Sequence, residues 1–341
     1  MSAVTAARQK SSSERGAALL AAMITVALVA TLAAAALWRQ WRGVEVETSE
    51  RARVQSSWIL GGALDWGRLI LAGDARESTV DHLGEPWAVP LEEARLSTFL
   101  AGGEASTETE REAFLSGQIT DLQSRLNIMN LLISKDTGTD DGKQPIDRFR
   151  RLFELLGLPA GELDALQRNL INAQAAMQST ETQKSDDAPL MPQRFDQLLW
   201  LGLTPATLET LRPYVTLLPL LNNSPTPVNL NTASAQVIYA AVPGLDLAGA
   251  EKLVGSRSSA YFQDTQKALN IVQRSGSDAL TSDWVSTTTN FFEIRGRLRL
   301  DDIALQEISV VRRIASPQRR TVLTLWRQRT ALNTPVPGMG P

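Results

Sequence analysis

The side chains of this sequence that could perform chemistry are few, and the densest group is an acidic loop. Asp136, Asp140 and Asp141 fall in one short segment with Gly138 among them. Carboxylates at this density suit a hard cation such as calcium, which takes about 6–8 oxygen ligands. The loop is not an EF-hand, because the D-x-D-x-D-G run and the terminal glutamate are absent. The alternative interpretation is an ordinary solvated acidic turn.

Side chains for nucleophilic catalysis are nearly absent. The 341 residues include one histidine, His82, and no cysteine. Thiol chemistry, disulfides and cysteine-based zinc sites are therefore excluded. A Ser-His-Asp triad would need His82, and the sequence has no nucleophile elbow. We expect His82 to support the neighbouring Glu85–Pro90 loop, so an enzyme here would depend on paired carboxylates with raised pKa values.

The strongest motif is PVNLNTASA, Pro227–Ala235, which precedes a helical segment, a Pro-Gly turn and a final arginine. Asn231 or Thr232 can cap a helix that starts near Ala233. The motif resembles the helix-hairpin-helix of DNA receptors used in competence, where a G-x-G turn offers backbone N–H groups to a phosphate. Here Asp246 replaces the second glycine, and its carboxylate would repel a phosphate. Nucleic acid is therefore not the expected partner, although a membrane-tethered DNA-binding protein stays as the alternative function.

The region 145–280 contains three segments with one shared pattern. Each has an apolar helix end, a glycine suited to a left-handed cap, and a new amphipathic helix. The glycines are Gly157, Gly202 and Gly244. We therefore expect 145–280 to be a large inserted all-α domain built from helix hairpins.

The sequence before these motifs predicts one long N-terminal helix. Ala17–Trp38 has 22 residues without a charge, which at helical rise spans about 33 Å, enough for one membrane crossing. The helix is expected over 17–72, with 17–38 in the bilayer. Its second half should pack on a globular domain, because Trp58 and Trp66 need burial.

The junction before this helix resembles a type IV prepilin leader, with residues 1–16 removed by prepilin peptidase. The small residue of the junction, Gly16, precedes the apolar core, so cleavage would leave Ala17 as the first mature residue. An ordinary N-terminal membrane anchor is the alternative. Most pilins and pseudopilins carry a glutamate at the fifth mature position, where this chain has Ala21. A subunit without that carboxylate should sit at the top of a fibre.

The last part of the chain predicts strands. Phe291–Leu300 alternates apolar and charged residues, and two further strands are expected over 305–314 and 320–329. With a strand near Ile119 they should form a small antiparallel sheet. The expected fold class is α+β: a split pilin-like α/β domain, 73–144 and 281–332, packed on the N-terminal helix, with the helical domain inserted. The tail 333–341 should be disordered.

Several motifs together resemble minor pseudopilin K of type II secretion systems. They are ITDLQ at Ile119–Gln123 with Arg125 and Asn127, the PYV-LP segment Pro213–Pro219, and the VNLNTA motif. The order of these motifs and the missing glutamate at Ala21 match that family. The resemblance covers nearly the whole chain.

This resemblance implies a mechanical role and no enzymatic activity. A K-type subunit would initiate or cap the pseudopilus that exports folded proteins across the outer membrane. Its partners would be other minor pseudopilins, the major pseudopilin and prepilin peptidase, and its mature N-terminus would be methylated. It would be a single-pass inner-membrane protein with its C-terminal domain in the periplasm. The family also binds calcium in its soluble part, which is consistent with the acidic loop.

Overall fold

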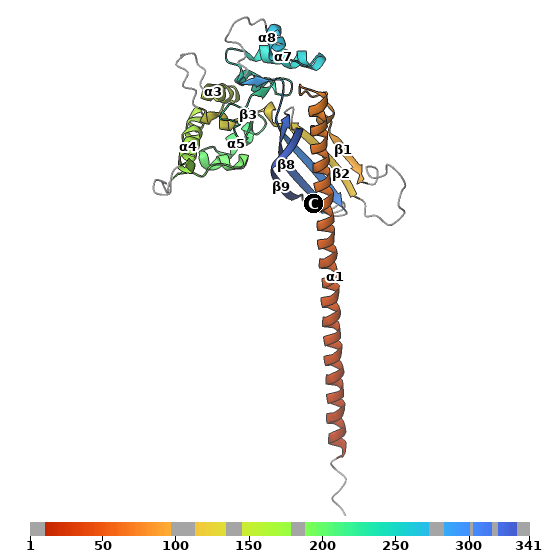
Figure 1. The fold of residues 1–341 in the computed structure, drawn as a ribbon. Helices are drawn as coiled ribbons and strands as arrows, with labels where there is room; N and C mark the ends of the chain where they lie inside the picture. Colours follow the sequence, from red (N-terminus) through yellow and green to blue (C-terminus); the bar gives the residue numbers. More distant parts are fainter. Residues whose placement is uncertain are drawn as a thin grey trace, which may run out of the picture. The chain divides into compact units, whose positions relative to one another are not determined.

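The computed structural model describes residues 11–96, 113–133, 145–178, 188–272, 283–300, 303–315 and 320–332 (Figure 1). The loop with Asp136, Asp140 and Asp141 lies outside these residues, as does the tail 333–341. The chain forms two compact units, Met1–Ile59 and Leu60–Pro341.

The first element is one continuous helix, α1, over Ser11–Glu77. It runs past the expected end at 72, and the Gly61-Gly62 pair does not break it. Among the described residues one helix is long and apolar enough to cross a membrane, and it is this one, near the N-terminus. The expected burial of both tryptophans is wrong, because Trp58 is 79% exposed and Trp66 is 49% exposed.

The unit Leu60–Pro341 contains a five-stranded sheet in the order β1-β2-β7-β8-β9, with every neighbouring pair antiparallel. The expected strands and their antiparallel pairing are confirmed, whereas the short edge strand β1 was not predicted. The strands are β1 Leu91–Arg95, β2 Ala113–Asp121, β7 Phe291–Leu300, β8 Ile303–Ala315 and β9 Arg320–Leu332.

The apolar face of the sheet packs on the end of α1. In β7 the even-numbered residues are buried and the charged ones between them are more exposed, as the alternation predicts. Leu64 and Leu71 of α1 share one core with Ile119 and Phe292 of the sheet. The helix and the sheet approach closely at Gly67, where a Cβ would lie only 2.9 Å from Cγ2 of Ile294.

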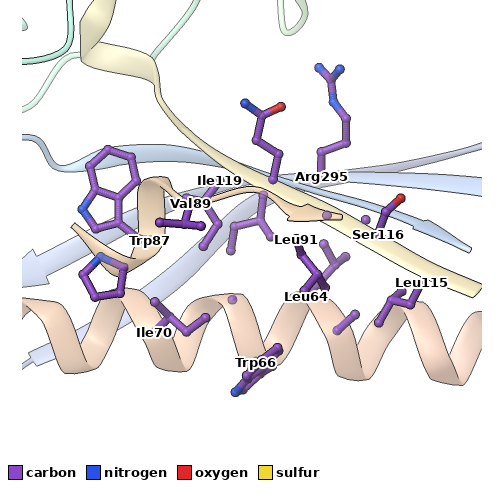
Figure 2. A pocket seen from close by; sticks show the side chains of 17 residues that line it. Leu64, Trp66, Ile70, Trp87, Val89, Leu91, Leu115, Ser116, Ile119 and Arg295 are labelled. Atoms are coloured by element: carbon purple, nitrogen blue, oxygen red, sulfur yellow. The ribbon is translucent and has the colours of Figure 1, made fainter. Parts of the chain in front are cut away.

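A small apolar pocket of about 70 Å³ opens beside this contact. Figure 2 shows Trp66 and Ile70 of α1 on one side of it and Trp87 and Val89 on the other, while Arg295 points away on the far side of the sheet. Trp87 belongs to the 3-10 helix η1, Pro86–Ala88. The pocket has an apolar wall and no carboxylate among its described lining residues.

The helical region lies between β2 and β7 in the sequence. Its α-helices are α3 Pro145–Leu156, α4 Ala160–Gln178, α5 Pro205–Leu211, α6 Ala235–Ala241, α7 Leu247–Ser259 and α8 Thr265–Ile271. They enclose a separate apolar core, in which Phe149, Leu166, Leu211 and Ile238 are fully buried. The expected combination of a pilin-like sheet and an inserted helical region is therefore confirmed.

The three predicted glycine caps are also confirmed. Gly157, Gly202 and Gly244 have φ values of +66°, +107° and +75°. Each lies just after a helical segment, and in each case the next α-helix begins three residues later. Because L side chains rarely adopt positive φ, glycine sets the turn of each hairpin.

The region between β2 and β7 also contains short elements that the sequence patterns did not predict. It holds the 3-10 helix η5, Phe195–Leu201, and two-residue strands that form parallel pairs with segments outside the helices. These strands are β3 Leu126–Asn127, which pairs with β4 Val215–Thr216, and β5 Val228–Asn229, which pairs with β6 Val285–Ser286. The 3-10 helices η2, Leu122–Ser124, and η3, Ile128–Leu132, flank β3.

Candidate functional site

Two of the motifs singled out in the sequence meet in one buried network, which we call the polar seam. It is formed by side chains from the ITDLQ segment and the residues that follow it, and from the VNLNTA segment and Thr226 just before it. Its members are Asp121, Gln123, Asn127, Asn130, Thr226, Asn229, Asn231 and Thr232. All of these except Thr232 are buried, so each polar group needs an internal partner.

Asp121 is the central acceptor of the polar seam. It ends β2 and caps η2, and its Oδ1 accepts a hydrogen bond of 2.7 Å from the backbone N–H of Gln123 within η2. Its Oδ2 accepts from Asn229 Nδ2 at 3.0 Å and from Thr232 Oγ1 at 2.6 Å. Burial raises the pKa of Asp121 to about 6, and the hydrogen bond from Thr232 opposes that rise.

The asparagines of the seam replace backbone partners where the chain has no regular ladder. Asn127 donates to the carbonyl of Leu218 and accepts from the same residue's N–H, each at 2.9 Å. Asn130 makes the same two-way bond with the backbone of Thr226, at 3.0 and 2.9 Å. A side-chain amide has one donor and one acceptor side, so it completes a strand-like pair in a single residue.

The VNLNTA segment is held from both sides. Asn231 exchanges two hydrogen bonds with the backbone of Phe262, at 2.9 and 2.8 Å. Arg257, the final arginine of the motif, donates from Nη1 to the carbonyl of Leu230 at 2.5 Å. The expected helix cap at Asn231 or Thr232 is wrong, because α6 is capped by Ser234, whose Oγ accepts from Val237 N. Asn231 and Thr232 instead belong to the polar seam.

A second buried group joins the end of α1 to the sheet. Three carboxylates, Asp74, Asp81 and Glu85, place oxygen atoms within 4.8 Å of one another. Arg313 of β8 lies among them: it bonds Asp74 at 2.6 Å and both oxygens of Asp81 at 2.5 Å. Burial raises the pKa of Asp74 to about 6 and also raises that of Asp81, while the Arg313 charge opposes both shifts.

These three carboxylates do not fit a metal ion. A cation would have to displace the Arg313 guanidinium from Asp74 and Asp81, and Glu85 Oε2 already accepts from Trp87 Nε1 at 2.7 Å. We interpret the group as a buried ion-pair cluster. The bonds of Arg313 to Asp74 and Asp81 and the bond of Trp87 to Glu85 hold α1, η1 and β8 together. No local sequence pattern predicts this group, because Arg313 and Asp74, which bond each other, are 239 positions apart in the chain.

The predicted structural role of His82 is confirmed. Its backbone N–H donates to Glu85 Oε2 at 2.9 Å, and its Nδ1 accepts from Gly84 N at 3.1 Å. The ring stacks on Tyr261, with centroids 3.9 Å apart. The histidine thus holds the turn before η1 and links it to the helical region.

The hairpin turn between α6 and α7 is unsuited to a phosphate. Asp246 caps α7, and its Oδ1 accepts from Gly249 N at 2.8 Å, so a carboxylate already occupies the helix start. Lys252 Nζ donates to the carbonyl of Ile271 at 2.8 Å. The geometry therefore favours a packing role for the hairpin.

The predicted processing residues lie in α1. Gly16, Ala17 and Ala21 are exposed helical residues, and they have no polar site around them in the unit Met1–Ile59 as far as it is described. The structure brings none of them to the polar seam. A membrane-length helix, an antiparallel sheet on its other end and a helical insertion together define a pilin-like, membrane-anchored subunit.

Comparisons with known proteins give the family. Two family models, both described as "Type II secretion system (T2SS), protein K", match residues 124–220 and 228–288. Type II secretion system protein K of Pseudomonas aeruginosa is 27% identical over 320 residues, which covers 88% of this chain and 89% of that protein. The chain belongs to the type II secretion system protein K family, whose members are minor pseudopilins, and this finding does not support the DNA-receptor alternative.

A solved structure supports the fold. It is described as the crystal structure of the GspK-GspI-GspJ complex from the enterotoxigenic Escherichia coli type 2 secretion system. The matched chain is 16% identical, the match covers 83% of this chain and 98% of that chain, and the TM-score is 0.57. The pilin-like sheet with a helical insertion is therefore an architecture that this solved chain shares. Asn127 and Asn130 of the polar seam lie in the first matched region and Asn229, Asn231 and Thr232 in the second, whereas Asp121, Gln123 and Thr226 lie just outside both.

Proposed function

We propose that this minor pseudopilin caps the tip of the type II secretion pseudopilus and helps to initiate its assembly for the export of folded proteins. The observation that carries the proposal is Ala21, an uncharged residue in the apolar part of α1. A carboxylate at this position would neutralise the N-terminal ammonium of a subunit above, and an unpaired charge in the bilayer costs about 2.5–3.5 kcal/mol. A chain with Ala21 offers no such partner, which favours the last place in the fibre.

The test is the position of the chain on isolated pseudopili. A C-terminal tag labelled with gold should mark one end of each fibre. Ala21→Glu should move labels along the shaft, because the variant can pair with a subunit above it. Ala21→Gln, which is polar but uncharged, is the matched control and should stay at the end. Labels along the shaft for the unchanged chain would overturn the tip assignment.

We also propose that prepilin peptidase cleaves between Gly16 and Ala17 and that the new N-terminus is methylated. Mass spectrometry of the mature chain, with and without the peptidase, tests this. A chain that begins at Ala17 only when the peptidase is present supports the proposal. An intact N-terminal segment in both cases would leave an ordinary membrane anchor.

The anchor is proposed to lie in the inner membrane, with the unit Leu60–Pro341 in the periplasm. The sequence has no cysteine, so one introduced cysteine is a unique label. Ser259→Cys, at an exposed position of α7, should react with a membrane-impermeant maleimide once the outer membrane alone is permeable. A cysteine that reacts only after lysis of the inner membrane would place this unit in the cytoplasm.

The proposed partners are the other minor pseudopilins, with the major pseudopilin below them in the fibre. The solved structure similar to this chain is described as a GspK-GspI-GspJ complex, which supports the choice. Co-purification of the full chain with the corresponding I and J subunits from its own system is the measurement. A chain that purifies alone when both are co-expressed would contradict the assembly.

Calcium is proposed as a ligand of the acidic loop, through Asp136, Asp140 and Asp141, whose carboxylates are the oxygen donors that calcium prefers. Calcium should raise the melting temperature of the full chain, and magnesium should do so less. The triple Asp→Asn variant should lose the calcium effect and keep the melting temperature measured in chelator. A calcium effect unchanged in the triple variant would exclude this loop.

We finally propose that the protein has no catalytic activity of its own. His82 is engaged with Gly84 and Tyr261, and the carboxylates with the clearest raised pKa values, Asp74 and Asp121, are both hydrogen-bonded internally. Secretion that persists in Asp121→Asn at normal protein levels would agree with this. Normal folding and normal assembly with complete loss of secretion would instead indicate chemistry at the carboxylate.

A further inference from the structure

A polar cleft of about 640 Å³ lies between the turn at His82–Gly84 and the C-terminal end of α7. It is separate from the apolar pocket of Figure 2, with which it shares no lining residue. Its described lining includes His82, Leu83, Arg257, Ser259 and Tyr261. The described lining contains a guanidinium, an imidazole and several hydroxyl groups, and no aspartate or glutamate.

Arg257 is the charged group of the cleft. It is half-buried, and its one hydrogen bond among the described residues goes to a backbone carbonyl, that of Leu230. Arg295 and Arg313 differ, because each forms an ion pair with a carboxylate. Arg257 forms no ion pair within the described part of the chain, and burial alone lowers its pKa to about 10. A guanidinium has five N–H donors, so most of those on Arg257 are available to an incoming acceptor.

His82 adds a second donor. Its Nδ1 accepts from Gly84 N, so the neutral ring carries its proton on Nε2, an assignment that follows from the hydrogen bond. The ring is held flat against Tyr261, at an interplanar angle of 11°. The nearby carboxylates bond other groups: Asp81 pairs with Arg313, and Oε2 of Glu85 accepts from Trp87 and from the His82 backbone. Oε1 of Glu85 is buried and has no hydrogen-bond partner among the described residues.

Two further charged side chains lie close to Gln263 of the lining: Lys267, whose Nζ bonds Oε1 of Gln263, and Asp264, which follows Gln263 in the sequence. Asp264 is the carboxylate of the two. Its Oδ1 accepts from the backbone N–H of Lys267 at 2.8 Å, as a cap at the start of α8. Asp264 is not among the lining residues of the cleft. The donors of Arg257 and His82 therefore face a space whose described walls contain no competing carboxylate.

We propose that this cleft binds a carboxylate carried by an acidic peptide segment of another protein. Arginine and carboxylate groups match in two parallel hydrogen bonds, which gives orientation as well as attraction. The volume lies within the usual range of about 300–1,000 Å³ for ligand pockets, which is larger than one small anion requires. The Tyr261 and Leu83 walls offer apolar contact to the rest of the segment. The inference does not depend on a place in the pseudopilus.

The experiment is calorimetric titration of the full chain in a neutral detergent. The probe is a short acetylated and amidated peptide that contains two adjacent glutamates, and its control has glutamines in their place. The glutamate peptide should bind about tenfold more tightly than the glutamine peptide, and more weakly as salt increases. Inorganic phosphate is the third probe. Phosphate binding without binding of the glutamate peptide would overturn the peptide proposal and indicate a small-anion site.

Two pairs of variants test the location. Ser259→Asp puts a carboxylate on the cleft wall without removing a described hydrogen bond, and it should weaken the glutamate peptide at least about tenfold. Ser259→Asn, of the same size, should bind within about twofold of the unchanged chain. Arg257→Gln should abolish binding, while Arg297→Gln on the sheet should not.

Circular dichroism and melting temperature must show that each variant is folded. Because Arg257 also holds the carbonyl of Leu230, its variant could fail to fold, and the Ser259 pair then decides. Equal binding to Ser259→Asp and Ser259→Asn would overturn the proposed site. Equal binding of the two peptides would overturn the proposed ligand.

Discussion

The hydroxyl of Thr232 donates to Oδ2 of Asp121 at 2.6 Å, across 111 positions of the chain. The bond joins the two motifs that sequence comparison would treat as separate, the end of β2 and the VNLNTA segment. Since Asp121 is fully buried, its remaining partners, Asn229 and the N–H of Gln123, cannot be replaced by water. The polar seam therefore fixes how the helical region joins the sheet.

Thr232→Val should destabilise the chain by about 1–3 kcal/mol. Valine has nearly the same shape as threonine, but it cannot donate the hydrogen bond to the buried Oδ2 of Asp121. The measurement is urea unfolding of the full chain in detergent, followed through the tryptophans. Thr210→Val is the matched control: Thr210 is exposed on α5 and bonds only its own helix, so the change should stay within about 0.5 kcal/mol. Equal effects of the two substitutions would remove the special role of Thr232.

The stability of the unit Leu60–Pro341 should fall as pH rises from about 4.5 to 7. The pKa values of Asp74 and Asp121 are each raised from 3.8 to about 6, by burial first. The folded state thus binds protons more tightly than the unfolded state between these values, and that stabilisation is lost as pH rises through 6. For fully buried Asp121 the change is on the order of 2 kcal/mol.

The check is the urea midpoint at pH 5 and at pH 7.5. Asp121→Asn should reduce the difference between the two urea midpoints, since the amide does not titrate. The pKa of Glu209 is lowered from its ordinary 4.5 by its hydrogen bond with Arg212. Its contribution to stability therefore changes only below pH 4.5 and does not alter the sign between pH 5 and 7.5. A midpoint that rises over that interval would contradict the assignment.

Arg313→Met should destabilise the chain by about 3–5 kcal/mol at pH 7.5, because it leaves Asp74 and Asp81 buried without their cation. Lower pH should restore part of the loss, since protonation removes the unpaired charge. The exposed pair of Arg299 and Glu93, at 2.8 Å, is the comparison, and Arg299→Met should cost less than about 1 kcal/mol. Similar losses for both arginines would mean that burial has no role.

Much of the architecture follows from local patterns. The alternation in Phe291–Leu300 predicts a strand and its buried face, and the glycines Gly157, Gly202 and Gly244 predict the hairpin turns, because each pattern depends on backbone geometry over a few residues. The apolar run Ala17–Trp38 predicts the membrane-length helix for the same reason.

What could not be predicted depends on distant partners. Asn231 and Thr232 have the right chemistry for a helix cap, and only the position of Asp121 and Phe262 shows that they bond elsewhere. Trp58 was expected to be buried from its size alone, yet it lies exposed on α1. The group around Arg313 joins three segments that no local pattern connects.

Replacement of glycine by alanine should lower the stability of the chain at two of the turns and raise it inside a helix. Gly157→Ala should destabilise the chain by about 1 kcal/mol, because alanine is strained at a φ of +66°, although the space around it is open. Gly202→Ala should cost more, since its Cβ would also lie 3.1 Å from the Cβ of Ala165. Gly255→Ala, inside α7 and in open space, should instead stabilise by about 0.5–1 kcal/mol. Urea unfolding of the three variants decides this, because a uniform loss would show that the alanine methyl group is costly at each position, whatever the backbone angle.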